Sequence, residues 1–268
     1  MTRIKNRFDQ LAVKGEKALI AYIMAGDPNL AETEKIVLEI AKAGADFIEL
    51  GIPFSDPVAD GPTIQKAAQR ALCQGVTLPL ILERVALLRK KTKIPILLMT
   101  YLNPMLALGL ELFFKEARSV GVDGVIIPDL PLEEAKTCLN WSRRYRIDLI
   151  FLVAPTTPFE RIKKIASFAT GFIYYVSITG ITGATIKEIT SVTERISQIK
   201  SLVKIPVVVG FGISTGEEAK AISRVADGVV VGSLFVKTME MDAGEGNLLP
   251  RLAEQVAGLK LAISMGKD

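Results

Sequence analysis

The segment Phe47–Ile64, FIELGIPFSDPVADGPTI, combines a short apolar strand with a loop and the start of a helix. Phe47–Ile52 is apolar on both faces except at Glu49, a pattern typical of a parallel strand that is covered on both sides. Pro53 ends this strand, and helix-period sequence begins near Thr63. The segment therefore predicts one strand–loop–helix unit with an acid near the carboxyl end of its strand.

The same unit recurs along the chain. Eight apolar runs predict strands, at Ala18–Ala25, Phe47–Ile52, Ile94–Thr100, Gly124–Pro128, Leu149–Ala154, Phe172–Ser177, Pro206–Gly210 and Gly228–Val231. Helix-period segments alternate with them, at Ala31–Ala43, Thr63–Gln74, Leu78–Lys91, Leu110–Val120, Leu132–Tyr145, Pro158–Ala166, Thr185–Ile199 and Thr215–Arg224. Two further helices are predicted, over Ile4–Val13 and Leu248–Ser264.

Eight strand–helix repeats favour closure into a barrel over an open doubly wound sheet, which usually has fewer strands. We therefore expect an α/β protein in which residues 1–268 form a single (β/α)8 TIM-barrel domain. The extra N-terminal helix is expected to cover the bottom of the barrel. Several predicted strands end in glycine or an acid, and the carboxyl ends of barrel strands are where active sites lie.

The composition indicates a compact globular protein, with 268 residues, 49% hydrophobic and 23% charged, and a net charge of +4. Basic residues are spread over the predicted helices, so nucleic-acid binding is not expected, and Arg89 to Lys91 are predicted to be a solvated helix end. No apolar run suits a membrane helix or a signal peptide, which predicts a cytoplasmic protein. Cys73 and Cys138 are predicted to be buried and reduced.

The chain contains no histidine, 0 in 268 residues. This excludes Ser-His-Asp and Cys-His nucleophiles, histidine-ligated zinc and an imidazole base. The two distant cysteines form no metal-ligand motif, so no metal site is predicted. Proton transfer must fall to Glu, Asp, Tyr, Lys or Cys.

Glu49 is the prominent candidate, because an ionised carboxylate in an apolar strand is costly and usually raises its pKa. Asp56 and Asp60 lie on the following loop. An alternative is that Glu49 pairs with a buried Arg or Lys, and that the two aspartates only cap turns or the helix near Thr63. The pattern alone leaves both interpretations open.

The last three strand ends predict a phosphate site. Glycines in SITGITGAT (177–185), VGFGIST (209–215) and VGSLF (231–235) allow backbone N–H groups to approach a dianion without a lysine. The alternative is that each glycine only permits a tight turn. Residues 178–185 suit a lid over the substrate, or a plain flexible loop. Apolar and aromatic side chains near strand ends offer a pocket, from Tyr22, Ile64, Met99, Tyr101, Ile127 and Tyr174.

ELGIPFSDPVADGPTIQ, followed in order by LMTYLNP, DGVIIPDLPLEE, SITGITGA and VVVGFGIST, closely resembles the α subunit of tryptophan synthase. The resemblance implies a barrel that cleaves indole-3-glycerol phosphate to indole and glyceraldehyde 3-phosphate. It also implies an α2β2 complex with a β subunit that carries pyridoxal phosphate, and no cofactor in this chain. A free-standing lyase and a mainly non-catalytic activating subunit remain alternatives.

The resemblance also implies roles for individual residues. Glu49 and Asp60 correspond to the catalytic carboxylates. The phosphate is expected on Gly183, Phe211, Gly212, Gly232 and Ser233, and the indole on Tyr22, Ile64, Met99, Ile127 and Tyr174. Thr182 belongs to the lid, and the β subunit is expected to face Pro53, Asp56, Pro57, Asn103 and Pro104.

Overall fold

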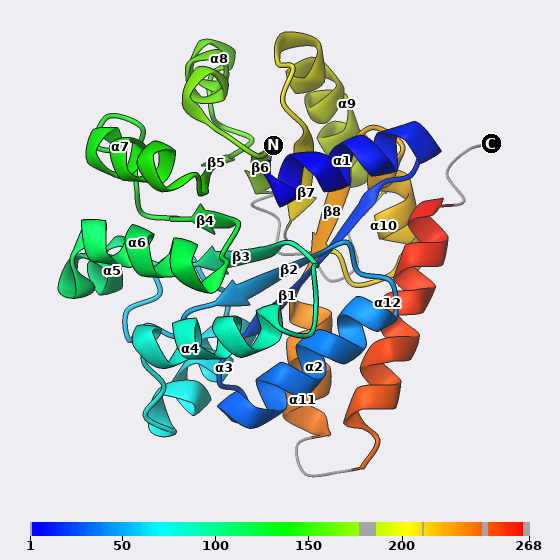
Figure 1. The fold of residues 1–268 in the computed structure, drawn as a ribbon. Helices are drawn as coiled ribbons and strands as arrows, with labels where there is room; N and C mark the ends of the chain where they lie inside the picture. Colours follow the sequence, from blue (N-terminus) through cyan, green and yellow to red (C-terminus); the bar gives the residue numbers. More distant parts are fainter. Residues whose placement is uncertain (1, 177–185, 211, 243–245, 265–268) are drawn as a thin grey trace.

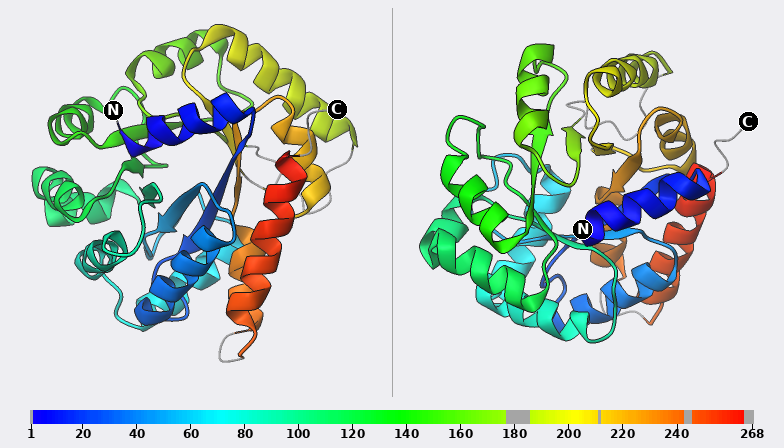
Figure 2. Two further views of the ribbon diagram at one scale, coloured as in Figure 1. Left: turned by 45° about the vertical axis from the view of Figure 1, so that its right-hand side comes forward. Right: turned by 45° about the horizontal axis from the view of Figure 1, so that its top comes forward.

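A closed barrel of eight parallel strands forms the centre of the protein (Figures 1 and 2). The computed structural model describes residues 2–176, 186–210, 212–242 and 246–264. The strands pair in chain order and β8 pairs with β1, which confirms the predicted (β/α)8 TIM barrel. The strands are β1 (Ala18–Met24), β2 (Phe47–Gly51), β3 (Ile96–Met99), β4 (Gly124–Ile126), β5 (Asp148–Val153), β6 (Ile173–Val176), β7 (Val207–Gly210) and β8 (Gly228–Val231).

Helices surround the strands on the outside of the barrel (Figure 2). Almost every strand residue is buried, because the barrel interior fills one face and the helices cover the other. The helices within the described residues are α1 (Arg3–Lys14), α2 (Leu30–Lys42), α3 (Pro62–Cys73), α4 (Leu78–Arg89), α5 (Leu102–Leu108), α6 (Leu110–Val120), α7 (Lys136–Tyr145), α8 (Phe159–Phe168), α9 (Ile186–Leu202), α10 (Gly216–Ser223), α11 (Ser233–Met241) and α12 (Leu248–Ser264).

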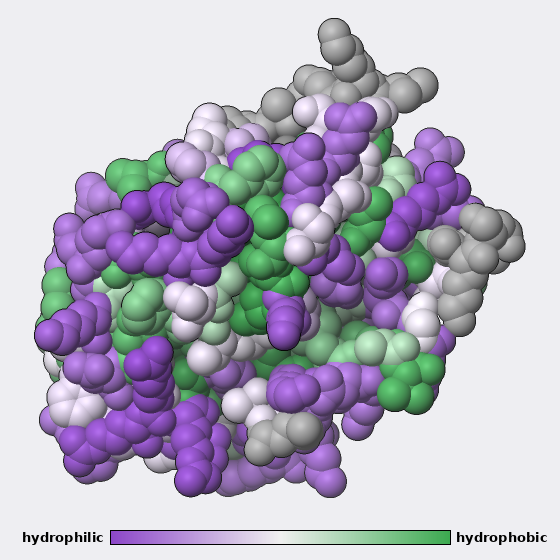
Figure 3. Space-filling view, turned by 90° about the horizontal axis from the view of Figure 1, so that it is seen from above, coloured by the Kyte–Doolittle hydropathy of each residue, from purple (hydrophilic) through white to green (hydrophobic). Residues whose placement is uncertain are grey.

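Helix α1 closes the end of the barrel where the strands begin. Its buried side includes Ile4 and Phe8, and the Phe8 ring lies 4.9 Å from the ring of Phe47, the first residue of β2. Figure 2 shows α1 lying across this end. Seen from above, the molecule has a mostly hydrophilic surface around a smaller apolar area (Figure 3). The predicted bottom helix is therefore confirmed, and the opposite end holds the carboxyl ends of the strands.

Three helices differ from the prediction. Helix α7 begins at Lys136 instead of Leu132, because Glu134 N–H and Ala135 N–H donate to carbonyls three residues back and make a tight turn. Helices α5 and α11 were not predicted. Asp129, which follows β4, accepts a hydrogen bond from Leu102 N–H at the start of α5, so the cap of this helix comes from a distant part of the sequence.

Two expectations about single residues were wrong. Lys90 and Lys91 are exposed as predicted, but Arg89 is not solvated, because its guanidinium donates to Asp123 and to the carbonyls of Gly121 and Ile94. Cys73 is exposed, whereas Cys138 is buried as predicted. Among the described residues, no single helix has the length and apolar character to cross a membrane, and only the sharply bent pair α3 and α4 meets that test jointly.

Candidate active site

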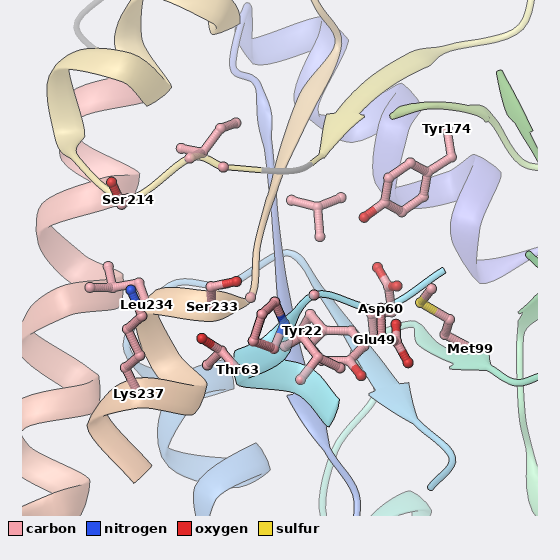
Figure 4. A pocket seen from close by; sticks show the side chains of 17 residues that line it. Tyr22, Glu49, Asp60, Thr63, Met99, Tyr174, Ser214, Ser233, Leu234 and Lys237 are labelled. Atoms are coloured by element: carbon pink, nitrogen blue, oxygen red, sulfur yellow. The ribbon is translucent and has the colours of Figure 1, made fainter. Parts of the chain in front are cut away.

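A cavity of about 300 Å³ lies at the carboxyl ends of the strands (Figure 4). Its walls come from strands β1, β2, β3, β6 and β8 and from the residues that follow β2, β7 and β8. The lining residues are Tyr22, Glu49, Asp60, Gly61, Pro62, Thr63, Ile64, Met99, Tyr174, Gly212, Ile213, Ser214, Val230, Gly232, Ser233, Leu234 and Lys237. Most of the substrate-site residues expected from the sequence are therefore brought together.

Glu49 lies in the middle of β2, paired in register with Tyr22 on one side and Leu97 on the other. Its side chain is 0% exposed, and neither carboxyl oxygen has a hydrogen-bond partner among the described residues. The alternative of a buried ion pair is thus wrong. Burial raises the pKa of Glu49 to about 8, and the negative charge of Asp60 acts in the same direction. At neutral pH this carboxyl carries a proton that it can give away.

Asp60 lies on the loop before α3 and faces the same cavity. The N-cap of α3 is Gly61 and has no side-chain cap, so Asp60 does not cap this helix. Burial raises the pKa of Asp60 to about 6, and a side-chain hydrogen bond with Tyr101 opposes the rise. The Tyr101 hydroxyl also accepts a hydrogen bond from Ala59 N–H at 2.9 Å. Two carboxyl groups in one cavity therefore differ in protonation at neutral pH, as two catalytic acids with different roles require.

Tyr22 and Tyr174 are buried at the edge of the cavity near Glu49 (Figure 4). Burial raises the pKa of both phenols, so both hydroxyls are neutral. Each hydroxyl occupies space that only a glycine leaves open. A Cβ on Gly51 would lie 2.2 Å from the Tyr22 hydroxyl oxygen, and one on Gly210 would lie 2.3 Å from that of Tyr174. Glycine is thus needed at both positions for steric reasons.

Gly212, Gly232 and Ser233 line the other end of the cavity. Helix α11 begins at Ser233, and its N-cap Gly232 has no side-chain cap, so the first N–H groups of the helix have no side-chain acceptor there. The N-terminus of α10, by contrast, has side-chain caps, because Thr215 and Glu218 form a capping box there. Thr182, Gly183 and Phe211 lie outside the described residues.

The remaining expected residues lie elsewhere. Ile127 is buried just beyond β4 and does not line the cavity. Of the residues expected to face a partner, Pro53 is buried, Pro57 and Pro104 are partly exposed, and Asp56 and Asn103 are exposed. The rings of Phe54 and Tyr101 lie 5.3 Å apart, so the two predicted interface segments are neighbours.

The sequence interpretation missed several lining residues, among them Thr63, Ser214, Leu234 and Lys237. Leu234 and Lys237 belong to α11, which the hydrophobic pattern did not reveal. The spacing of four residues between Ser233 and Lys237 places both on one face of a helix, and that signal was present in the sequence. No group of three or more potential metal ligands occurs in the part of the chain that the structure describes.

The chain is similar over its whole length to known proteins. The family model described as tryptophan synthase alpha chain matches residues 8–264. The tryptophan synthase alpha chain of Citrifermentans bemidjiense is 50% identical, with 99% of each chain covered. The structure of tryptophan synthase subunit alpha from Legionella pneumophila str. Paris is 36% identical, covers 98% of each chain and has a TM-score of 0.92. A tryptophan synthase structure from M. tuberculosis is 32% identical, covers 98% of this chain and 100% of its own, and has a TM-score of 0.88. The chain belongs to the tryptophan synthase alpha chain family.

Proposed function

We propose that this chain cleaves indole-3-glycerol phosphate to indole and D-glyceraldehyde 3-phosphate. The observation that carries the proposal is the pair Glu49 and Asp60, two acids in one cavity with Glu49 fully buried and unpaired. Membership of the tryptophan synthase alpha chain family names the reaction, and the absence of histidine leaves these carboxyls as the natural acid–base groups.

Cleavage of the bond between the indole ring and the glycerol chain requires one proton to move from a glycerol hydroxyl to C3 of the ring. Protonated Glu49 gives its proton to C3, which makes the ring an electron sink. The resulting carboxylate takes the hydroxyl proton as the carbonyl forms and the carbon–carbon bond breaks, and the bonding electrons return to the ring. Glu49 ends as it began, and each such proton transfer typically contributes about 10²–10⁴-fold to the rate.

Asp60 has a different task in this proposal. When C3 is protonated, positive charge develops at the indole N1–H, and an ionised carboxylate close by stabilises it. A pKa of about 6 leaves Asp60 ionised at neutral pH. Met99, Ile64, Tyr22 and Tyr174 supply the apolar and aromatic walls that suit an indole ring.

The phosphate of the substrate is assigned to the end of the cavity near Gly212, Gly232 and Ser233, together with Gly183 and Phe211. The start of α11 supports this assignment, because N–H groups at the start of a helix bind anions. We assign Thr182 to a lid over the bound substrate.

The family also suggests a partner. We propose that the chain, as one domain, docks on a β subunit through Pro53, Asp56, Pro57, Asn103 and Pro104, in a cytoplasmic α2β2 complex. The β subunit would carry the pyridoxal phosphate and join the released indole to serine. Support comes from the packing of Phe54 against Tyr101, which joins the two segments into one surface.

The test is indole release from indole-3-glycerol phosphate by Glu49→Gln. The amide keeps the size of the side chain but cannot exchange the proton, so we expect indole release to fall by at least about 100-fold. Inorganic phosphate is expected to bind as in the unsubstituted protein, which checks that the cavity is intact. Asp60→Asn is expected to show a comparable loss. Near-normal turnover in either variant would remove that residue from the mechanism.

A further inference from the structure

The cavity has opposite charges at its two ends. Figure 4 shows Glu49, Asp60, Met99 and Tyr174 at one end, and Ser214, Leu234 and Lys237 at the other, with Tyr22, Thr63 and Ser233 between them. Lys237 is the one basic side chain among the described residues that line the cavity. Its side-chain nitrogen points towards Leu234, on the same helix, and towards Ser214 (Figure 4).

Lys237 has no acidic partner within the described part of the chain. The next two acids after Lys237 in the sequence already have basic partners. Glu240 pairs with Arg70 at 3.0 Å, and Asp242 pairs with Arg251 at 2.9 Å. The positive charge of Lys237 is therefore not neutralised by an ion pair. It adds to the partial positive charge at the start of α11, one turn before it on the same helix.

We infer that Lys237 is a positioning residue that orients the substrate by attracting its phosphate dianion to the α11 end of the cavity. The inference rests on the proposed function, because that function supplies a substrate with a dianion at one end and an indole ring at the other. A reversed substrate would bring the phosphate beside Asp60, which is ionised at neutral pH, so that like charges repel. The sequence pattern predicted a phosphate site of backbone N–H groups that does not need a lysine, and our inference adds a side-chain cation to it.

Because Lys237 is exposed, its attraction for an anion is partly screened by water and salt. We expect an effect on binding more than on chemistry. In Lys237→Gln, the KM for indole-3-glycerol phosphate and the inhibition constant of inorganic phosphate are expected to rise about 3- to 5-fold, with kcat within about twofold. Binding of indole, which is uncharged, is expected to be unchanged.

Two further variants isolate the charge. Lys237→Arg keeps it and is expected to restore most of the affinity for phosphate. Lys66→Gln removes an exposed lysine of α3 that does not line the cavity, and is expected to leave both constants unchanged. Raising the ionic strength from about 0.02 to 0.2 M is expected to weaken phosphate binding more in the unsubstituted protein than in Lys237→Gln, because salt screens the charge that the variant lacks.

The outcomes separate the two proposals. If the unsubstituted protein releases no indole, the proposed function fails, and the phosphate titrations still test Lys237. If it releases indole and Lys237→Gln keeps the KM and the phosphate constant within about twofold, the inference is overturned. An equal change in Lys66→Gln also overturns it, because the effect then belongs to the net charge of the molecule.

Discussion

Glu49 is costly to the folded protein. In the unfolded chain its pKa returns to the ordinary value, 4.5, whereas burial raises the pKa to about 8 in the folded protein. Between these two pH values the unfolded chain loses its proton and the folded protein keeps it, so the free energy of unfolding falls as pH rises. The residue that carries the proposed chemistry therefore weakens the fold across the neutral range.

This linkage predicts the behaviour of Glu49→Gln. The amide does not titrate, so the variant lacks this loss of stability, which amounts to roughly 3–5 kcal/mol between pH 4.5 and 8. Urea denaturation of both proteins at several pH values is the measurement. We expect the two stability curves to diverge as pH rises, with the variant more stable at pH 8. Parallel curves would show that Glu49 titrates normally in the folded protein.

Gly51 provides a second prediction for a single residue. An added Cβ would lie 2.2 Å from the hydroxyl oxygen of Tyr22 and 2.7 Å from its Cζ atom. Gly51→Ala is therefore expected to lower the free energy of unfolding by about 1–3 kcal/mol, and to cost much less when Tyr22→Ala is also present. Chemical denaturation of the four proteins measures this coupling. Gly258→Ala in α12, where nothing lies within 4 Å of the added atom, is the control and is expected to be neutral or stabilising. If the effects of Gly51→Ala and Tyr22→Ala on the free energy of unfolding simply add in the double variant, the proposed contact is contradicted.

The two proposed catalytic carboxyls differ in how visible they are in the sequence, because only Glu49 breaks a local rule. An acid in an apolar strand is conspicuous, and the zero count of histidine narrows the chemistry further. Asp60 breaks no rule, so the loop pattern could not separate a catalytic acid from a turn residue. Its raised pKa depends on burial beside Tyr101, which is 41 positions away in the numbering and visible only in the folded chain.

Among the elements, the starts of β2, β4 and β8 share one arrangement. Asp46, Asp123 and Asp227 each directly precede a strand, and each accepts a hydrogen bond from a backbone N–H at the start of the preceding strand. Each also pairs with a basic side chain: Arg7 and Lys260 with Asp46, Arg3 and Arg89 with Asp123, and Lys200 with Asp227. These contacts tie neighbouring strands together at the end of the barrel that lies away from the cavity.

Arg89 tests the importance of this arrangement. Its side chain is 11% exposed and donates to the 3% exposed carboxylate of Asp123 and to three backbone carbonyls. Arg89→Ala leaves these acceptors buried with fewer donors, so we expect the free energy of unfolding to fall by about 2–4 kcal/mol. Lys90→Ala, an exposed neighbour, is the control and is expected to change it by less than about 0.5 kcal/mol. Thermal and urea unfolding measure the stability of both variants. Equal losses in Arg89→Ala and Lys90→Ala would show that the hydrogen bonds of Arg89 do not stabilise the fold.

The alternation of strands and helices was predictable because barrel strands are continuous apolar runs and the outer helices are amphipathic. The elements that were missed depend on distant contacts. Helix α5 contains Pro104 in its first turn and is capped by Asp129, which follows another strand. Helix α11 begins directly after β8, without a loop of polar residues to mark its start.

For the molecule as a whole, the two ends of the barrel have separate tasks. The end covered by α1 holds the paired aspartates, and the other end holds the cavity and the predicted docking surface. A partner that docks beside the cavity reaches Asp60 through the loop that bears Pro53, Asp56 and Pro57. Docking and catalysis are therefore expected to be coupled through this loop.

This separation leads to a prediction about the partner. Leu106, on α5 beside Asn103 and Pro104, is 53% exposed and does not line the cavity. Leu106→Asp places a charge on the predicted docking surface, so we expect weaker binding of a tryptophan synthase β subunit, by about 10-fold or more, with unchanged indole release from the isolated chain. Isothermal titration with the β subunit measures the affinity.

The matched control is Leu261→Asp. Leu261 is 58% exposed on α12, a helix that packs against α2, α10 and α11 and lies across the molecule from α5 (Figure 1). The same substitution at nearly the same exposure is expected to leave the affinity unchanged, because only the α5 side is continuous with the loop that carries Asp60. A partner that binds Leu106→Asp normally but loses affinity for Leu261→Asp would place the docking surface on the α12 side, and Asp60 would then have no direct route to the partner.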